Sequence, residues 1–293
     1  MTPLTNKDEA QDRAKRIGLP AGPLSYTQIN TWLMCHRAYW HNYVNRTPWD
    51  GWKENLVLGA AMHSGLEFVN RQKMGGSKII LDGALRAMDT TLASELSSSK
   101  WKVSDGDKRK LDKQLEMMGR LLELWVNNSL PGFRPTGVEE TRYVLLGGIP
   151  MTIKIDLIDD DRKVCDFKLT GSFKNEKSVK NSLQLSIYAA STKIMRASYI
   201  SFRFPKLEMK KAWKPEIEEI VVNKNPGDLE WAEEVVASVS KGILLEDWSL
   251  CDPGDWKCNK EFCDVWSKCR GRTFEATTKP KWMKKMLRTQ GSL

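Results

Sequence analysis

The chain has 293 residues, 41% of them hydrophobic, which is enough for a buried core and excludes a largely disordered protein. Lys and Arg number 46 against 37 Asp and Glu, and the resulting net charge of +9 favours a polyanionic partner, above all nucleic acid. No stretch approaches the roughly 18 to 20 apolar residues of a membrane span, and no apolar run near the N-terminus is typical of a signal peptide. We therefore expect a cytoplasmic protein without a membrane partner.

The chain is predicted to consist of one domain between two polar ends. Residues 1–23 are polar and end in Pro20, Gly22 and Pro23, which favours an N-terminal arm ahead of the fold. The domain is expected over residues 24–271. The remaining residues, 272–293, form a basic tail that contains four lysines and one arginine after residue 278.

The first half of this domain is predicted to be helical. Ser25 and Gln28 form a capping-box pattern, which begins a helix that is expected to continue to Tyr43. A second amphipathic helix is predicted over about 56–71, and two more helices form an insertion over 79–130.

The second half is predicted to carry a sheet. After Pro131 and Pro135 the pattern changes to short β-rich segments separated by turn residues. The elements expected in chain order are three strands, a crossover helix, two strands and a final helix, at residues 137–146, 150–158, 162–169, 179–195, 199–204, 217–222 and 229–245. This order indicates an α/β fold whose core, residues 137–222, is a central mixed sheet.

One predicted hairpin groups two acids and a lysine. Side chains alternate along a strand, so Asp166 and Lys168 project from the same face and Phe167 from the other. If the hairpin is centred on Asp161, then Asp156 lies opposite Asp166 and all three polar groups share one face. Two carboxylates beside an ammonium can hold a divalent cation and act on a phosphate and a water. The alternative is an ordinary hairpin with a solvent-facing Asp and Lys.

Other motifs lie on both sides of this hairpin. The four motifs in chain order are Leu24-Ser25-Tyr26-Thr27-Gln28-Ile29 through Cys35-His36-Arg37-Ala38-Tyr39, Gly59-Ala60-Ala61-Met62-His63, Asp156 with Asp166-x-Lys168, and Gln184-Leu185-Ser186-Ile187-Tyr188. Together they resemble the RecB-type branch of the PD-(D/E)XK nuclease superfamily across most of the chain. The resemblance implies a restriction-endonuclease-like core for residues 24–271 and a metal-dependent nuclease activity.

The resemblance also implies roles for individual residues. His63, Asp156 and Asp166 would be metal ligands for Mg²⁺ or Mn²⁺, and the backbone carbonyl of Leu169 would complete the metal shell. Lys168 would be catalytic, together with both aspartates. A second group, Gln184 and Tyr188, would approach the substrate or the lysine, and their i, i+4 spacing puts them on one helix face. A packed histidine and a packed tyrosine are the alternatives for His63 and Tyr188.

The chain departs from the family pattern next to the first aspartate. Ile153 stands where the family usually has glycine, and Lys154 adds a charge on the face expected to carry Asp156. On the preceding strand, Glu139 or Glu140 could add a further metal ligand. The sequence does not choose between these two acids, and exposure at the surface is the other interpretation for each.

Five of the six cysteines lie in two places, and a reducing cytoplasm favours metal or cluster ligation over disulfides. Cys258-x4-Cys263-x5-Cys269, with the distant Cys35, resembles the iron–sulfur staple of RecB-type and CRISPR-associated adaptation nucleases. The resemblance implies that these four cysteines hold a 4Fe-4S cluster in a loop at residues 251–271, with zinc as the alternative occupant. Cys251 could substitute for Cys258, and Cys165 is expected to be a buried small side chain.

The expected function is a Mg²⁺- or Mn²⁺-dependent DNA exonuclease that acts on single-stranded or end-processed DNA in recombination or repair. The alternatives are a structure-specific endonuclease, a non-catalytic DNA-binding recombination partner and an RNA-processing protein. Trp248, Trp256 and Trp266 could stack on bases or shield the cysteines, and the tail at 272–293 could track a phosphate backbone. The chain has no Walker-type phosphate loop, so a helicase would have to be a partner, as would any recombination protein.

Overall fold

The computed structural model of this chain describes residues 2–50, 54–97, 105–160, 162–204 and 213–271. In this described part, six strands form one mixed sheet with the spatial order β1-β2-β3-β4-β5-β6. The strands are β1 (Thr2–Pro3), β2 (Pro135–Leu146), β3 (Ile149–Asp159), β4 (Lys163–Thr170), β5 (Arg196–Arg203) and β6 (Ile217–Asn223). The α/β class and the mixed sheet are therefore confirmed.

The longer helices are α1 (Lys7–Arg16), α2 (Tyr26–Met34), α4 (Glu54–Met74), α5 (Leu81–Ser97), α6 (Asp105–Leu124), α8 (Leu183–Thr192) and α9 (Pro226–Leu244). The shorter helical segments are α3 (His36–Tyr39), α7 (Glu176–Lys180), η1 (Trp40–Val44), η2 (Trp125–Ser129), η3 (Leu130–Gly132) and η4 (Ser267–Gly271). The predicted crossover helix over 179–195 is thus two helices, because Ser182 caps the start of α8 by accepting a hydrogen bond from the Leu185 backbone N–H.

Local turns explain the order of the strands. Gly147 and Gly148 have φ values of 56° and 79°, the left-handed geometry that a two-residue hairpin turn requires, and they join β2 to β3. A second turn joins β3 to β4. The step from β4 to β5 is parallel, so the chain must cross over, and α7 and α8 form that crossover.

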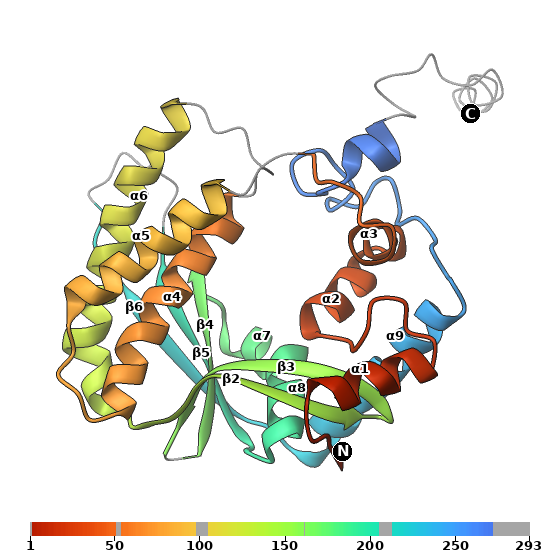
Figure 1. Cartoon of the computed structure of the whole chain (residues 1–293), viewed down its shortest axis with the longest axis horizontal. Helices are drawn as coiled ribbons and strands as arrows, with labels where there is room; N and C mark the ends of the chain where they lie inside the picture. The colour runs from red at the N-terminus through yellow and green to blue at the C-terminus, as the bar shows by residue number, and fades with distance from the viewer. Residues whose placement is uncertain (1, 51–53, 98–104, 161, 205–212, 272–293) are drawn as a thin grey trace.

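Two hydrophobic clusters hold the helices against the sheet. One contains buried residues of α1, α2, α8 and α9 together with strand residues such as Ile155 and Val164. The other contains buried residues of α4, α5 and α6 together with Leu157, Phe167 and Phe202. Figure 1 shows α4, α5 and α6 on one side of the sheet and α1, α2 and α9 on the other. The predicted helical insertion over 79–130 lies within the second cluster.

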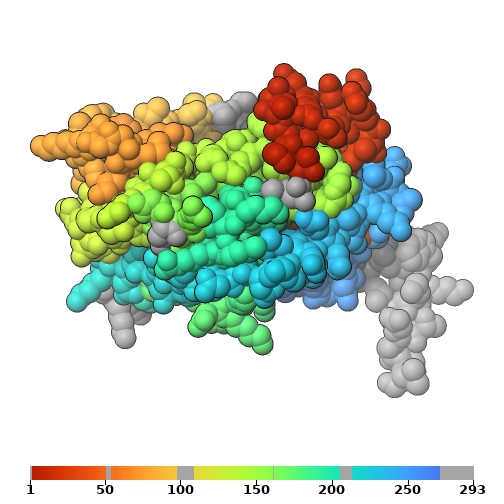
Figure 2. Space-filling model, turned by 90° about the horizontal axis from the view of Figure 1, so that it is seen from below, coloured from red at the N-terminus to blue at the C-terminus, as the bar shows by residue number. Residues whose placement is uncertain are grey.

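The N-terminal residues are part of the fold, and the prediction of an arm over 1–23 was wrong. Thr2 and Pro3 pair with Leu145 and Val144 of β2, and Figure 2 shows the red N-terminal part of the chain packed against yellow-green residues. On α1, the side chains of Ala10 and Ala14 are fully buried. Two alanines four residues apart let the helix approach the sheet closely, but they give little hydrophobic signal in a sequence.

The predicted first helix is interrupted. Ser25 caps α2 as expected, but Cys35 has an extended backbone with φ −166° and ψ 116°, so α2 ends and α3 begins there. The predicted helix over 56–71 is confirmed as α4, which ends at Met74, directly before Gly75 and Gly76. No helix in the described part of the chain is long and apolar enough to span a membrane.

Candidate active site

The sheet forks at the centre of the molecule. Strands β3 and β4 pair only through Leu157↔Cys165, Ile158↔Val164 and Asp159↔Lys163. Beyond these pairs β3 continues beside β2, whereas β4 continues beside β5 (Figure 1). At the fork the Asp156 carboxylate accepts a hydrogen bond from the Phe167 backbone N–H at 2.7 Å. The Asp156 side chain thus accepts the Phe167 N–H, which a backbone carbonyl of β3 would accept if the ladder between β3 and β4 continued.

The register of the described pairs confirms the predicted hairpin. All three pairs are centred on position 161, which itself lies outside the described residues, and the next position in this register brings Asp156 opposite Asp166. Both carboxylates are almost fully buried, with 6% and 1% of each residue exposed. The fork therefore concentrates two negative charges in the interior, which requires nearby positive charge or protonation.

Lys168 supplies part of that positive charge within a hydrogen-bonded network. Its Nζ lies 2.7 Å from Asp166 Oδ2 and donates to Gln184 Oε1 at 3.0 Å. Gln184 Nε2 donates to Asp166 Oδ1 at 2.5 Å and to the Tyr188 hydroxyl at 3.0 Å, and that hydroxyl donates to Asp166 Oδ1 at 3.2 Å. Gln184 and Tyr188, four residues apart on α8, thus orient the Asp166 carboxylate and the lysine together.

The environment keeps this network in defined protonation states. Burial disfavours the Lys168 ammonium, but the adjacent Asp166 carboxylate outweighs burial and raises the pKa of the lysine. Burial, followed by the negative charge of Asp166, raises the pKa of Tyr188 well above its ordinary value. Lys168 is therefore a fixed cation and Tyr188 a fixed hydroxyl donor around neutral pH.

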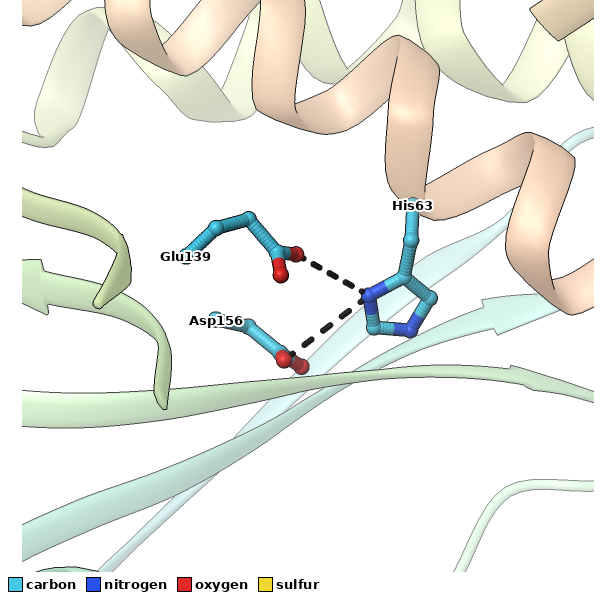
Figure 3. Close-up of side chains that lie close together, drawn as sticks. All are labelled: His63, Glu139 and Asp156. Carbon is cyan, nitrogen blue, oxygen red and sulfur yellow. Dashed lines mark hydrogen bonds and ion pairs between the residues drawn. The ribbon is translucent and has the colours of Figure 1, made fainter. Parts of the chain in front are cut away.

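A second group of side chains, His63, Glu139 and Asp156, lies outside the Lys168 network. His63, on α4, directs Nδ1 toward Glu139 Oε1 at 3.4 Å and toward Asp156 Oδ1 at 3.8 Å (Figure 3). Potential ligand atoms of these three residues lie within 4.8 Å of one another. One imidazole nitrogen and two carboxylates at this spacing are a suitable donor set for a divalent cation.

The charges within this second group are strongly coupled. Burial raises the pKa of Asp156 to about 7, and the nearby Asp166 charge acts in the same direction. For His63, burial favours the neutral ring, but the Glu139 hydrogen bond and the carboxylate charges outweigh burial and raise the pKa. For Glu139, hydrogen bonds from His63 and Lys154 outweigh burial and lower the pKa. The site is a compact acidic centre held by neighbouring cations.

The structure distinguishes the two acids that the sequence left open. Only 6% of the Glu139 side chain is exposed, and it lies in the site, where its Oε2 is 2.5 Å from Lys154 Nζ. Glu140 instead pairs with Arg142 at 2.7 Å, and 35% of its side chain is exposed. Strand alternation separates the two faces, but only the register of β2 against β3 shows which face meets Asp156.

Two predicted metal ligands have other surroundings in this structure. Asp166 lies outside the group of His63, Glu139 and Asp156, because its oxygens face Lys168, Gln184 and Tyr188. Leu169 follows Lys168 in β4, where it pairs with Phe202 and packs in the second hydrophobic cluster.

One aromatic side chain of this site was not among the predicted residues. Tyr199 of β5 lies opposite Asp166, and Lys168 Nζ is 5.4 Å from the centre of its ring. The signal that could have revealed Tyr199 is the parallel register of β4 and β5, which a sequence does not display.

Residues 23–270 match the family model of the PD-(D/E)XK nuclease superfamily. The chain belongs to this superfamily. The match covers most of the chain and includes the fork, the Asp166-x-Lys168 motif and the cysteine-rich loops. Among curated proteins, no sequence matches the chain significantly.

Two solved structures of exonucleases are among those similar to the chain. A proposed exonuclease from Eubacterium rectale has a TM-score of 0.54 and 12% identity, covering 97% of this chain and 98% of that protein. A phage-related exonuclease from Haemophilus somnus 129PT has a TM-score of 0.30 and 14% identity, covering 62% of this chain and 92% of that protein. The likeness to the first of these supports the assigned fold over the full length of the chain.

The nuclease fold brings five cysteines to one pocket. The pocket has a volume of about 300 Å³, and the cysteines that line it are Cys35, Cys251, Cys258, Cys263 and Cys269. Burial, followed by the adjacent thiol of Cys35, raises the pKa of Cys251 to about 12, and Cys251 also contacts Cys258. The sixth cysteine, Cys165, is fully buried in the second hydrophobic cluster, as expected.

Hydrogen bonds hold the cysteine loops against the start of the nuclease domain. The Arg37 backbone N–H donates to the Ser249 carbonyl at 3.0 Å, and the Asp50 backbone N–H donates to the Asp264 carbonyl at 2.7 Å. Asp50 also accepts a hydrogen bond from the Ser267 backbone N–H at 2.6 Å. Segments about 210 residues apart in the sequence are therefore neighbours, as Figure 1 shows for α3 and the blue C-terminal loops.

The three tryptophans near the cysteines have different surroundings. Trp248 stacks on Tyr39 with ring centres 6.0 Å apart, and Trp266 lines the pocket. Trp256 is 65% exposed and packs edge-on against the 57% exposed Phe262. Two of the three thus serve packing, and Trp256 remains available at the surface. The basic tail at 272–293 lies outside the described residues.

Proposed function

We propose that the protein is a metal-dependent deoxyribonuclease that hydrolyses phosphodiester bonds. The observation that carries this proposal is the division of the fork into two complementary halves, one built around Asp156 and the other around Asp166. One half offers nitrogen and carboxylate ligands, and the other holds a lysine cation beside a buried aspartate. The net charge of +9 supports a polyanionic substrate.

His63, Asp156 and Asp166 are the proposed ligands, with the carbonyl of Leu169 at the edge of the same fork. A bound Mg²⁺ or Mn²⁺ would polarise the phosphoryl oxygen and lower the pKa of a water molecule. Asp156 has a pKa of about 7, so it can release its proton to solvent when a cation replaces it.

Lys168 is proposed to orient the attacking water and to stabilise negative charge that develops on the phosphate. Its ammonium is fixed between Asp166 and Gln184, which favours electrostatic stabilisation over proton abstraction. Tyr188 and Gln184 would then hold Lys168 and Asp166 in position during the reaction, because both are bonded to the Asp166 carboxylate.

Attack from a DNA end is the proposed mode of cleavage. The resemblance to RecB-type nucleases supports an exonuclease, and so does the name of the Eubacterium rectale protein. We propose that the strand approaches the fork between α5 and α6 on one side and the C-terminal loops on the other, which Figure 1 shows at opposite sides of the view. We place the activity in recombination or repair in the cytoplasm, with a helicase or recombination protein as partner.

A 4Fe-4S cluster is the proposed occupant of the cysteine pocket, held by Cys35, Cys258, Cys263 and Cys269. The convergence of five cysteines on one pocket supports this proposal, because a cubane requires four thiolate ligands, and zinc is the alternative occupant. Such a cluster would fix α2 and α3 against the C-terminal loops.

The proposed activity is tested with purified protein, Mg²⁺ or Mn²⁺, and end-labelled linear DNA in single- and double-stranded forms. A covalently closed single-stranded circle of the same sequence and a matched RNA are offered in parallel. An exonuclease degrades the linear DNA and leaves the circle intact. Equal cleavage of the circle would favour the structure-specific endonuclease, and preferred cleavage of RNA would favour RNA processing. Binding without any cleavage would indicate the non-catalytic recombination partner.

A further inference from the structure

Glu139 has an unusual backbone for a strand residue. Its neighbours form regular pairs, Val138↔Leu157 and Glu140↔Ile155, so Glu139 lies opposite Asp156 in the register. Yet its φ is 50°, in the left-handed region that disfavours a side chain with a Cβ. The other described non-glycine residues with positive φ lie in turns or after helices, at Arg46, Arg162, Lys193 and Glu246. Strain inside a strand at such a position often accompanies function.

The strained residue directs a buried carboxylate to two different cations. Glu139 Oε1 faces His63 Nδ1 at 3.4 Å, while Oε2 lies 2.5 Å from Lys154 Nζ. Lys154 comes from β3, two residues before Asp156, and 60% of its side chain is exposed. The Glu139 carboxylate therefore lies between His63, inside the fork, and the exposed ammonium of Lys154.

Neither residue belongs to the set that the nuclease motifs assign to the site. The group of three ligand atoms nevertheless contains Glu139 with His63 and Asp156, whereas the oxygens of Asp166 are engaged with Lys168 and its neighbours. Glu139 is thus better placed than Asp166 to share an ion with His63 in this conformation. A cation held there would compete with Lys154 for the same carboxylate.

We propose that Glu139 is an additional ligand of the metal ion and that Lys154 is exchanged from Glu139 to the DNA backbone when the metal binds. This inference rests on the proposed function, because it concerns the same ion. Without a divalent cation, Lys154 neutralises Glu139. With the cation bound, the carboxylate turns to the metal, and the exposed ammonium is free to contact a phosphate. Metal binding would therefore strengthen DNA binding through one specific lysine.

The metal half of the proposal is tested by calorimetric titration of the full-length, metal-free protein with Mn²⁺. Glu139→Gln should raise the Kd for Mn²⁺ by about 10-fold or more, the usual effect of losing a partner in a metal site. Lys154→Met should lower it, because the competing ammonium is gone. Glu140→Gln is the matched control, since that neighbouring side chain pairs with Arg142 outside the site. Thermal unfolding of each variant shows that the fold is retained.

The DNA half is tested by fluorescence anisotropy with a labelled single strand at several salt concentrations, in EDTA and in Ca²⁺. In Ca²⁺, Lys154→Met should reduce the slope of log K against log salt by about 0.7, the contribution of one phosphate contact. In EDTA the slope of log K against log salt for Lys154→Met should equal that of the wild type.

Each result discriminates between the two proposals. Unchanged Mn²⁺ affinity in Glu139→Gln, or weaker Mn²⁺ binding in Lys154→Met, would overturn the additional ligand. An equal slope change in EDTA and in Ca²⁺ would overturn the exchange of Lys154. If the wild type binds no Mn²⁺ and Asp156→Asn makes no difference, the proposed function itself fails. If the wild type binds Mn²⁺ and only Asp156→Asn loses it, the function stands and this inference fails.

Discussion

Asp156 and Phe167 are joined across the fork by a hydrogen bond of 2.7 Å from the Phe167 backbone N–H to the Asp156 carboxylate. The bond fixes the acid at the point where β3 and β4 separate, so the same carboxylate ends the ladder and faces the site. An asparagine can accept this hydrogen bond with its side-chain oxygen, whereas an alanine would leave a buried N–H without its partner.

The first prediction concerns stability against pH in the metal-free protein. The folded pKa of Asp156 is about 7, above its ordinary value of 3.8, because the group is buried and lies near Asp166. Between these values the folded state holds a proton that the unfolded state has lost, so rising pH destabilises the fold. Asp156→Asn should therefore be more stable than the wild type, and the difference in Tm should grow from about pH 4 to about pH 7 and level off at higher pH. If the difference in Tm between Asp156→Asn and the wild type, measured in EDTA, did not change with pH, the raised pKa of Asp156 would be contradicted.

The second prediction concerns catalysis by the network around Lys168. Lys168→Ala and Asp166→Ala should each lower the rate of DNA cleavage by about a thousandfold or more, because fixed charge at the reacting phosphate is lost. The far-UV spectrum and DNA binding should stay close to those of the wild type. Lys177→Ala, an exposed lysine on α7, is the control and should retain full activity. Full activity of the Lys168 variant would refute the assigned site.

The third prediction concerns the choice of metal. EDTA should abolish cleavage, and Ca²⁺ should restore DNA binding without turnover. Because His63 contributes a nitrogen ligand, Mn²⁺ should match or exceed Mg²⁺, which prefers shells made of oxygen. The measurement is the initial rate on linear DNA with each ion at equal concentration. A His63→Asp variant should shift the preference toward Mg²⁺, and an unchanged Mn²⁺ to Mg²⁺ rate ratio would argue against His63 as a ligand.

The fourth prediction concerns the five cysteines of the pocket. Protein purified without oxygen should be brown and contain about four irons per chain. Cys35→Ser should lose the iron and unfold at a lower temperature. Cys258→Ser should retain more iron than Cys35→Ser, because Cys251 lies in the same C-terminal loops as Cys258 and can take its place, whereas Cys35 comes from the distant N-terminal segment of the pocket. Cys165→Ala is the control and should keep its colour, and a colourless wild type with one zinc per chain would exclude the cluster.

The fifth prediction concerns the strain at Glu139. Glycine adopts a φ of 50° without the penalty that a Cβ brings, which is about 1–2 kcal/mol. Glu139→Gly and Glu139→Gln both remove the carboxylate, so any difference in their unfolding free energy measures the backbone. The glycine variant should be the more stable of the two in EDTA. Equal stabilities in urea titrations would show that the strand tolerates this conformation without strain.

Much of the site could be predicted from the sequence because its parts are local. The turn centred on residue 161 places Asp156 opposite Asp166, and strand alternation puts Lys168 on the same face. Helical periodicity brings Gln184 and Tyr188 to one side of α8. These relationships depend on a few neighbouring residues, whose geometry is the same in any protein.

The tertiary structure alone decided the relationships between distant segments. It selected Glu139 over Glu140, because the choice depends on the register of β2 and on one left-handed residue. It made residues 2–23 part of the sheet and its helical cover, although two small alanines carry little periodic signal. It also brought Cys251 to the same pocket as Cys35. Contacts of this kind arise from packing across hundreds of residues, and no local pattern in the chain encodes them by itself.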